Sequence, residues 1–182
     1  LLDQMGVLPT YNFQRTSFDK APAISGETLA EKYLQKKKAC FGCPIACGRG
    51  TRVEVPGYEG EGEGPEYETI YAFGGLCLID RIEEIAYLND ICDRLGMDTI
   101  TAGNLCAFTI EAARRGKIDY KIDYGEVDEI AELLKMMARR EGLGDLLAEG
   151  LAPKTVWDHA DGLQAFCNWC VMRGHLEDNP LK

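Results

Sequence analysis

Apolar side chains recur every three to four residues over most of this chain, which is the spacing of one face of an α-helix. Ser25 offers a helix N-cap, and the pattern after it predicts a helix that runs to a cationic end at Lys36–Lys38. Further helices are predicted over residues 80–95, 99–115, 126–140 and 145–148. The remaining segments predict a short strand, Thr51–Val55, and a flexible acidic loop, Tyr58–Pro65. The fold class expected from this pattern is mainly α.

The helix predicted over residues 80–95 carries clear start and stop signals. Asp80 and Glu83 have the spacing of a capping box, and Gly96 can close the helix with a positive φ. Its inward face is expected to consist of Ile85, Leu88, Ile91, Cys92 and Leu95. In the helix over 126–140, the residues expected to face inward are Ile130, Leu133, Leu134 and Met137.

Composition and charge exclude some partners. A chain of 182 residues with 46% hydrophobic side chains can bury a sizeable core. Acidic residues outnumber basic ones by 30 to 20, and the net charge of -10 repels a nucleic-acid backbone. No apolar run approaches the roughly 20 residues needed to span a membrane. The first residues lack the basic and apolar regions of a secretory signal, so we expect a cytoplasmic location.

Candidate chemistry is concentrated in the run Ala39–Arg49, which contains Cys40, Cys43 and Cys47. Thiolates with the spacing C-x2-C-x3-C on one tight loop can each bind a different iron of a single cluster. The run therefore predicts three ligands of a [4Fe-4S] cluster.

Two other interpretations of the cysteines stay open. A structural zinc site needs a second pair, which Cys167 and Cys170 could supply. Disulfides are disfavoured in a reduced cytoplasm. The cysteines that lie in apolar stretches are expected to be buried small side chains, namely Cys77, Cys92 and Cys106.

A second candidate site is the junction of two predicted helices at Asp93–Asp98. Gly96 can end the first helix and Asp98 can cap the second, so carboxylates and free backbone N–H groups converge there. Asp93 and Asp98 could accept hydrogen bonds from a ligand rich in N–H donors, such as a pterin, and the helix start at Thr99 could face its phosphate. Ordinary helix capping explains the same residues, and on the residues alone that alternative is favoured.

A third candidate is the pair Glu66 and Glu68, which flank Tyr67. Either carboxylate could act as a general acid or base if burial under the apolar run Ile70–Leu78 raised its pKa. Most glutamates in such a pattern are solvated, so the pattern does not choose between the two.

Five segments together resemble the aldehyde:ferredoxin oxidoreductase family in order and spacing. They are Leu8–Phe13, Ile24–Glu27, the cysteine run Ala39–Arg49, Gly64–Thr69 and Asn89–Gly103. The resemblance extends from Leu8 to about Gly150 and implies helical domains like the C-terminal ones of that family. It also implies a tungsten or molybdenum bis-pyranopterin and one nearby [4Fe-4S] cluster, in an enzyme that oxidises small aldehydes to acids and reduces ferredoxin.

The resemblance assigns roles residue by residue. It makes Cys40, Cys43 and Cys47 three cluster ligands and Glu68 the acid–base carboxylate near the metal. Asp93, Gly96, Met97 and Asp98 resemble the first of two pterin-binding motifs, with Met97 in place of the usual Leu. His175 is the candidate for the active-site histidine, although Arg173–His175 is shorter than the family pattern, and His159 is a weaker candidate.

Parts of the family pattern are not found in this sequence. The N-terminal domain that supports the pterins is missing, as is the second pterin motif with the fourth cluster cysteine, so another domain or a partner chain is expected to supply them. We therefore expect residues 1–150 to form a helical iron–sulfur and pterin-binding domain, followed by a C-terminal extension over residues 151–182. Association of identical copies stays open.

Two classes of function follow. The first is part of an oxidoreductase that acts on aldehydes, or on an aromatic thioester as in the benzoyl-CoA reductase branch of the family. The second is a stand-alone iron–sulfur module that transfers electrons or binds without catalysis.

Overall fold

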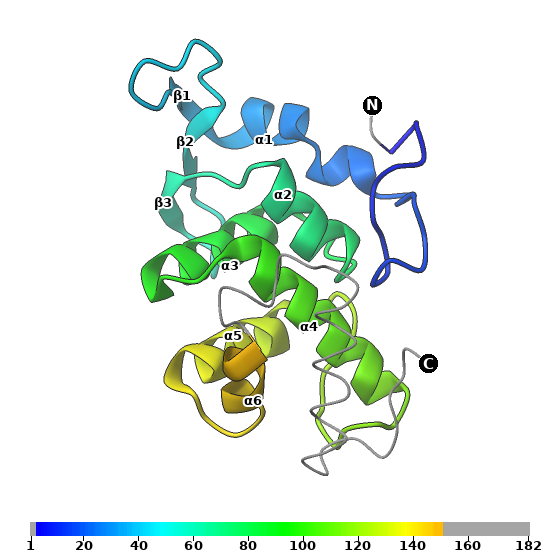
Figure 1. Ribbon diagram of the computed structural model, residues 1–182. Helices are drawn as coiled ribbons and strands as arrows, with labels where there is room; N and C mark the ends of the chain where they lie inside the picture. The colour runs from blue at the N-terminus through cyan, green and yellow to red at the C-terminus, as the bar shows by residue number, and fades with distance from the viewer. Residues whose placement is uncertain (1–2, 151–182) are drawn as a thin grey trace.

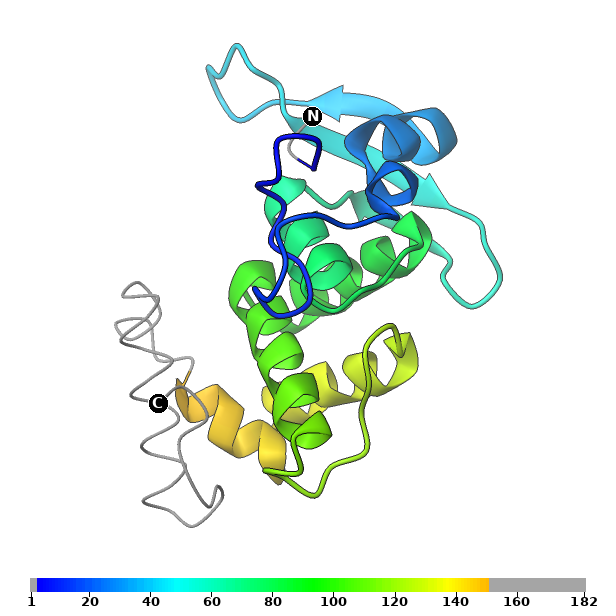
Figure 2. The ribbon, with the colours of Figure 1, turned by 90° about the vertical axis from the view of Figure 1, so that its right-hand side faces the viewer.

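The computed structural model describes residues 3–150, which form a mainly helical fold, so the expected fold class is confirmed. Figures 1 and 2 show a small sheet and helix α1 at one end, α5 and α6 at the other, and α3 and α4 between them. In chain order the elements are η1 (Ala21–Ile24), α1 (Gly26–Tyr33), β1 (Leu34–Lys38), β2 (Gly48–Val53), β3 (Gly60–Glu63), α2 (Tyr67–Thr69), η2 (Ile70–Gly75), α3 (Ile82–Leu95), α4 (Thr99–Arg114), α5 (Val127–Arg139) and α6 (Leu143–Gly150).

The sheet is antiparallel with strand order β1-β2-β3, and it corrects two expectations. The helix that begins after Ser25 ends at Tyr33, and Lys36–Lys38 lie in β1, where Lys37 pairs with Arg49 of β2. Gly60–Glu63 is strand β3 and not a loop. Both segments are extended because β2 supplies backbone partners from elsewhere in the chain.

The core forms where the π-helical segment η2 packs against α3 and α4, which in turn pack against α5, with α2 leading directly into η2. The four inward residues predicted for α5 are buried, and so are Cys77, Cys92 and Cys106, as expected. On α3 the predicted face is buried except for Leu95, which is 41% exposed at the last turn.

Two of the predicted helix caps can be compared with the structure. The side chain of Ser25 accepts a hydrogen bond from the Thr28 N–H at 3.1 Å, so this N-cap is confirmed. Asp80 is not a cap, because Arg81 occupies that position and its guanidinium binds Glu83 and Glu84. In residues 3–150, no helix is long and apolar enough to cross a membrane.

Candidate metal centre

The three cysteines of the run Ala39–Arg49 lie on the loop that joins β1 to β2, at the upper left of Figure 1. Cys40 and Cys47 are exposed and Cys43 is half-buried. The Cys43 N–H donates to the Cys40 carbonyl at 3.0 Å, which closes a turn around the C-x2-C pair. The spacing thus produces the local turn that a shared metal group requires.

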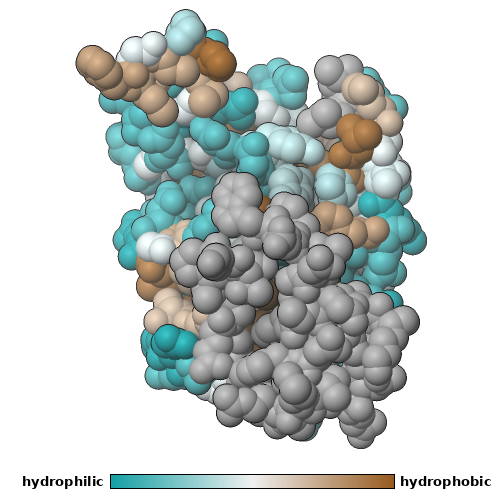
Figure 3. Space-filling view, viewed as in Figure 1, coloured by the Kyte–Doolittle hydropathy of each residue, from teal (hydrophilic) through white to brown (hydrophobic). Residues whose placement is uncertain are grey.

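The tip of this loop is apolar as well as rich in sulfur. Phe41 is fully exposed and Ile45 is 78% exposed. The space-filling view shows hydrophobic atoms gathered at this end of the molecule (Figure 3). A patch of large exposed apolar side chains is a feature of surfaces that contact another protein or another part of the same protein.

The donor set fits an iron–sulfur cluster by its chemistry, although it is not assembled in this conformation. In the described part of the chain, no three His, Cys, Asp or Glu side chains converge closely enough to hold a metal ion. All three thiols nevertheless belong to one short surface loop, so convergence requires a rearrangement of that loop alone. The second pair required by the zinc interpretation, Cys167 and Cys170, lies outside the described residues.

Glu66 lies against the cysteine loop. The negative charge of the nearby Glu66 raises the pKa of the Cys47 thiol above its ordinary value, and desolvation adds to this. The residue just before α2 therefore contacts the third cysteine, which the sequence did not suggest.

Glu68 occupies a different environment. It lies on the short helix α2 and is exposed, as are Glu66 and Tyr67, so these carboxylates are solvated, as most glutamates in such a pattern are, and are not buried under the apolar run. The apolar run after them is buried, but it packs away from the carboxylates into the core. The hydroxyl of Thr69, the next residue, lies 2.8 Å from that of Thr99, the first residue of α4.

The junction between α3 and α4 has the predicted capping geometry. Gly96 has a φ of 69° and closes α3, with the Met97 N–H bonded to the Cys92 carbonyl at 2.9 Å. One oxygen of Asp98, Oδ2, accepts from both the backbone N–H and the hydroxyl of Thr101, at 2.7 and 2.6 Å. The capping interpretation of Asp98 is therefore confirmed, and Oδ1 is the oxygen that a ligand could use.

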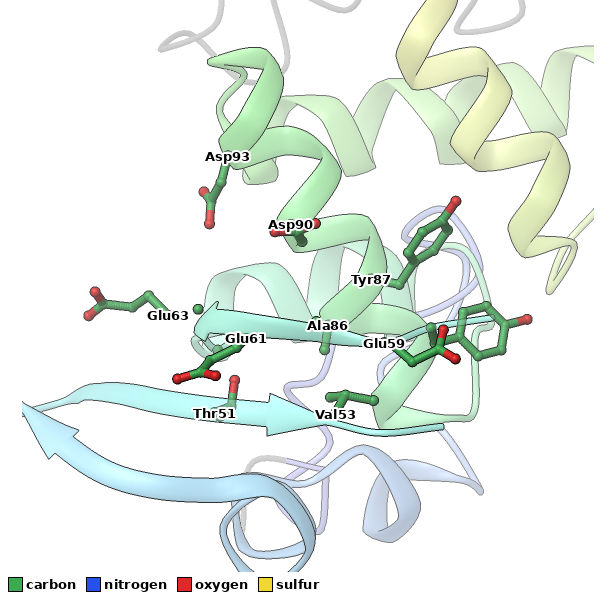
Figure 4. Close-up of a pocket in the computed structure, with 13 residues that line it drawn as sticks. Thr51, Val53, Glu59, Glu61, Glu63, Ala86, Tyr87, Asp90 and Asp93 are labelled. Atoms are coloured by element: carbon green, nitrogen blue, oxygen red, sulfur yellow. The ribbon is translucent and has the colours of Figure 1, made fainter. Parts of the chain in front are cut away.

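Asp93, one turn before the junction, stands at the end of a groove between α3 and β3. Figure 4 shows Asp90 and Asp93 on α3 across from Glu61 and Glu63. The side-chain amide of Asn89 donates to Asp93 Oδ2 at 3.0 Å and also to the Glu63 carbonyl, which joins helix to strand. Partial desolvation raises the pKa of Asp93, and the negative charge of Asp90 adds to it.

These contacts bring together motifs that are far apart in the sequence. Cys47 touches Glu66, Glu66 leads into α2 with Glu68, and Thr69 joins α2 to Thr99 beside Asp98. The three candidate sites are therefore connected along one side of the fold. His175 and His159 lie outside the described residues.

Comparison with known proteins identifies relatives of this chain. A family model described as aldehyde ferredoxin oxidoreductase, domains 2 and 3, matches residues 1–155. The tungsten-containing aldehyde ferredoxin oxidoreductase of Pyrococcus furiosus is 38% identical over 157 residues, or 82% of this chain and 26% of that protein. The aliphatic sulfonate oxidoreductase, WOR-like subunit, of the same organism is 32% identical over 148 residues, or 78% of this chain and 24% of that protein. This chain thus spans about a quarter of the length of these relatives.

A solved structure shares the fold. The active site complex BamBC of benzoyl coenzyme A reductase, in complex with 1,5-dienoyl-CoA, matches with a TM-score of 0.57 at 20% identity. The match covers 67% of this chain and 18% of that one. The family match runs through the cysteine loop, α2 and the junction of α3 and α4. The chain belongs to the aldehyde ferredoxin oxidoreductase family, in the portion described as its domains 2 and 3.

Proposed function

We propose that this chain is the cluster-binding and pterin-binding portion of an oxidoreductase that oxidises aldehydes to carboxylic acids and passes the electrons through a [4Fe-4S] cluster to ferredoxin. The observation that carries the proposal is the continuous line of contacts from Cys47 through Glu66 and α2 to Thr99 and Asp98. Electron transfer and proton transfer need such groups close together, and separate structural roles for the three motifs would not require it.

The reaction converts RCHO and water into RCOOH, two electrons and two protons. A tungsten or molybdenum bis-pyranopterin, when bound, would accept the electron pair, and the cluster would pass the electrons on one at a time. Glu68 would take a proton from the reacting water or aldehyde hydrate. Because Glu68 is exposed in this chain, the walls that exclude water from it would come from the rest of the protein or a partner chain.

The junction of α3 and α4 would hold the pterin. Asp98 would offer Oδ1, because Oδ2 caps α4. Asp93 would offer the oxygen that Asn89 does not bind. Gly96 and Met97 would form the turn between the two carboxylates.

The proposal can be tested on the full-length protein purified without oxygen. We expect tungsten or molybdenum and about one [4Fe-4S] cluster per chain, with aldehyde-dependent reduction of a viologen dye and of ferredoxin. An aliphatic sulfonate and an aromatic CoA thioester should be assayed beside a panel of aldehydes. An iron–sulfur cluster without tungsten or molybdenum would instead favour an electron-transfer module, and stoichiometric zinc without iron would refute both.

The cysteine ligands can be tested individually. Cys43→Ser should abolish most of the visible thiolate-to-iron absorbance and most of the iron content, because the cluster loses one of three ligands from this loop. Cys106→Ala is the control, since Cys106 is buried in the core and does not belong to the cysteine loop. Equal iron content in the two variants would exclude Cys43 as a ligand.

A further inference from the structure

Arg49, two residues after the last cysteine of the loop, places its positively charged side chain against the N-terminal turn of a helix. Its guanidinium lies against Gly26 in the first turn of α1, where an added Cβ would be 2.9 Å from Nη1 and 3.1 Å from Nη2. The Arg49 carbonyl accepts from the Gly64 N–H at 2.7 Å, and its backbone pairs with Lys37 in the sheet. The backbone of Arg49 is thus fixed by β2, and the space for its head group exists because residue 26 is glycine.

Within the part of the chain that the structure describes, no carboxylate is paired with the guanidinium. Among residues 3–150, Arg49 forms no ion pair within 4.0 Å, whereas Arg52 on the same strand binds Glu61 at 2.7 Å. The pKa of Glu27 is lowered mainly by hydrogen bonds from its own backbone turn and from Ser25, and the charge of Arg49 is only a minor contribution. A cation at the N-terminal end of a helix is moreover opposed by the helix dipole. An anionic group on the other side of the guanidinium would offset this cost.

Arg49 also lines a hollow of about 400 Å³. It is lined by the first turns of α1, by Lys37, and by Ile45, Cys47 and Arg49. The hollow therefore brings together a candidate cluster cysteine, Arg49 and the positive end of α1, with Glu27 also in its lining.

We propose that Arg49 sets the reduction potential of the iron–sulfur cluster by placing a fixed positive charge and N–H donors beside Cys47, with Gly26 positioning the guanidinium. The proposal rests on the proposed function, because it requires the cluster. Reduction adds one negative charge to the cluster, so a nearby cation and hydrogen bonds to the sulfurs favour the reduced state. Glu66 on the neighbouring side of Cys47 acts in the opposite direction, so the potential reflects the balance of the two side chains.

The test is a redox titration of the full-length protein, followed by the electron paramagnetic resonance signal of the reduced cluster. Arg49→Gln should shift the midpoint potential to more negative values, and Arg49→Lys should stay closer to the parent because it keeps the charge. Gly26→Ala should give a smaller shift in the same direction, since the new methyl group displaces the guanidinium without removing it. Arg52→Gln is the matched control and should leave the potential unchanged, because its charge is exposed and already paired.

Each outcome of the redox titration either supports or overturns the role proposed for Arg49. A parental midpoint potential in Arg49→Gln, with full cluster content, would overturn the proposal. If the Gln variant lost the cluster, a Lys variant with cluster at the parental potential would support it, and loss of cluster in both would overturn it. Absence of a [4Fe-4S] signal in the parent would refute the proposed function as well, whereas a parental cluster with an unresponsive potential would refute the role of Arg49 alone.

Discussion

Glu66 and Glu68 are only two residues apart, yet they meet different partners. Glu66 lies close enough to the Cys47 thiol to raise its pKa, while Glu68 is exposed on α2 one residue before Thr69, whose hydroxyl contacts Thr99. Glu66 is the N-cap residue before α2 and has an extended backbone, whereas Glu68 lies inside the helix, so the chain changes conformation between them. The two carboxylates should therefore affect different parts of the reaction.

Substitution of each glutamate separates these roles. In the full-length enzyme, Glu68→Gln should keep metal and cluster but lower kcat by about 10²-fold or more, because a general acid or base is lost while the shape is retained. Glu66→Gln is the comparison and should retain most of kcat. A damaging Glu66→Gln beside a silent Glu68→Gln would move the proton-transfer role to Glu66.

Asp98 combines a structural and a proposed binding role in one carboxylate, and the structure allows them to be separated. Asp98→Ala should lower the free energy of unfolding by about 1 kcal/mol, because α4 loses its cap, and should also lose the metal cofactor. Asp98→Ser should restore the cap but not the pterin contact, since Ser is a good N-cap without a charge. Unfolding curves and tungsten or molybdenum content measure the two effects. Full metal content in both variants would limit Asp98 to capping.

At the scale of elements, local patterns predicted the longer helices and part of β2, and they missed β1, β3 and the helical segments α2 and η2. The apolar period of α3, α4 and α5 is set by burial on one face, which can be read from neighbouring residues. The lysines of β1 and the glycines of β3 have no local preference for a strand, and they become strands because β2 pairs with both.

The candidate site, too, was only partly predictable from the sequence. The cysteines and the capped junction of α3 and α4 could be predicted, because each motif lies within a few consecutive residues. The contacts that join the runs were not visible, since Cys47–Glu66, Thr69–Thr99 and Arg49–Gly26 each need the tertiary fold. The glycine in Ile24–Glu27 was a possible signal of a close approach, but it did not identify the partner.

The hydroxyl pair that joins α2 to α4 can be tested by a double-mutant cycle. Thr69→Val should lower the free energy of unfolding by about 1 to 3 kcal/mol, because Thr69 is buried and the Thr99 hydroxyl loses its partner. The double variant, with Thr99→Val added, should cost less than the sum of the single changes. Urea unfolding of all four proteins gives the coupling energy, and strict additivity would show that the hydroxyls do not interact.

At the scale of the whole molecule, the net charge affects how the chain could meet the electron acceptor proposed above. A chain of net charge -10 would repel an acidic ferredoxin unless a local cationic patch lies near the cluster. Lys36–Lys38 provide such a patch beside the cysteine loop, and their place in β1 removes the alternative that they neutralise a helix end. Lys38 is already paired with Glu63 at 3.5 Å, so Lys36 and Lys37 carry most of the available charge.

Replacing all three lysines with Gln should lower the second-order rate of ferredoxin reduction severalfold and flatten its dependence on salt. Activity with a small uncharged dye should not change. The control variant, with Lys117, Lys121 and Lys135 changed to Gln, removes the same charge near α5, at the opposite end of the molecule (Figure 1). If both variants show the same rates and salt slopes, the position of the charge is irrelevant and the docking role is excluded.

The π-helical segment η2 also bears on how members of this family can change in length. In it, the Leu76 N–H donates to the Tyr71 carbonyl five residues back, so the segment holds one residue more than an α-helix of the same rise. Deletion of one residue between Tyr71 and Gly75 would restore regular α-helical bonding and so need not unfold the core. It would leave the segments before and after η2 in nearly the same relative orientation, because the wider turn is what accommodates the extra residue. Glu68 would then keep its direction relative to α3 and α4, so a homologue shortened at this point could keep both the fold and the position proposed for this carboxylate.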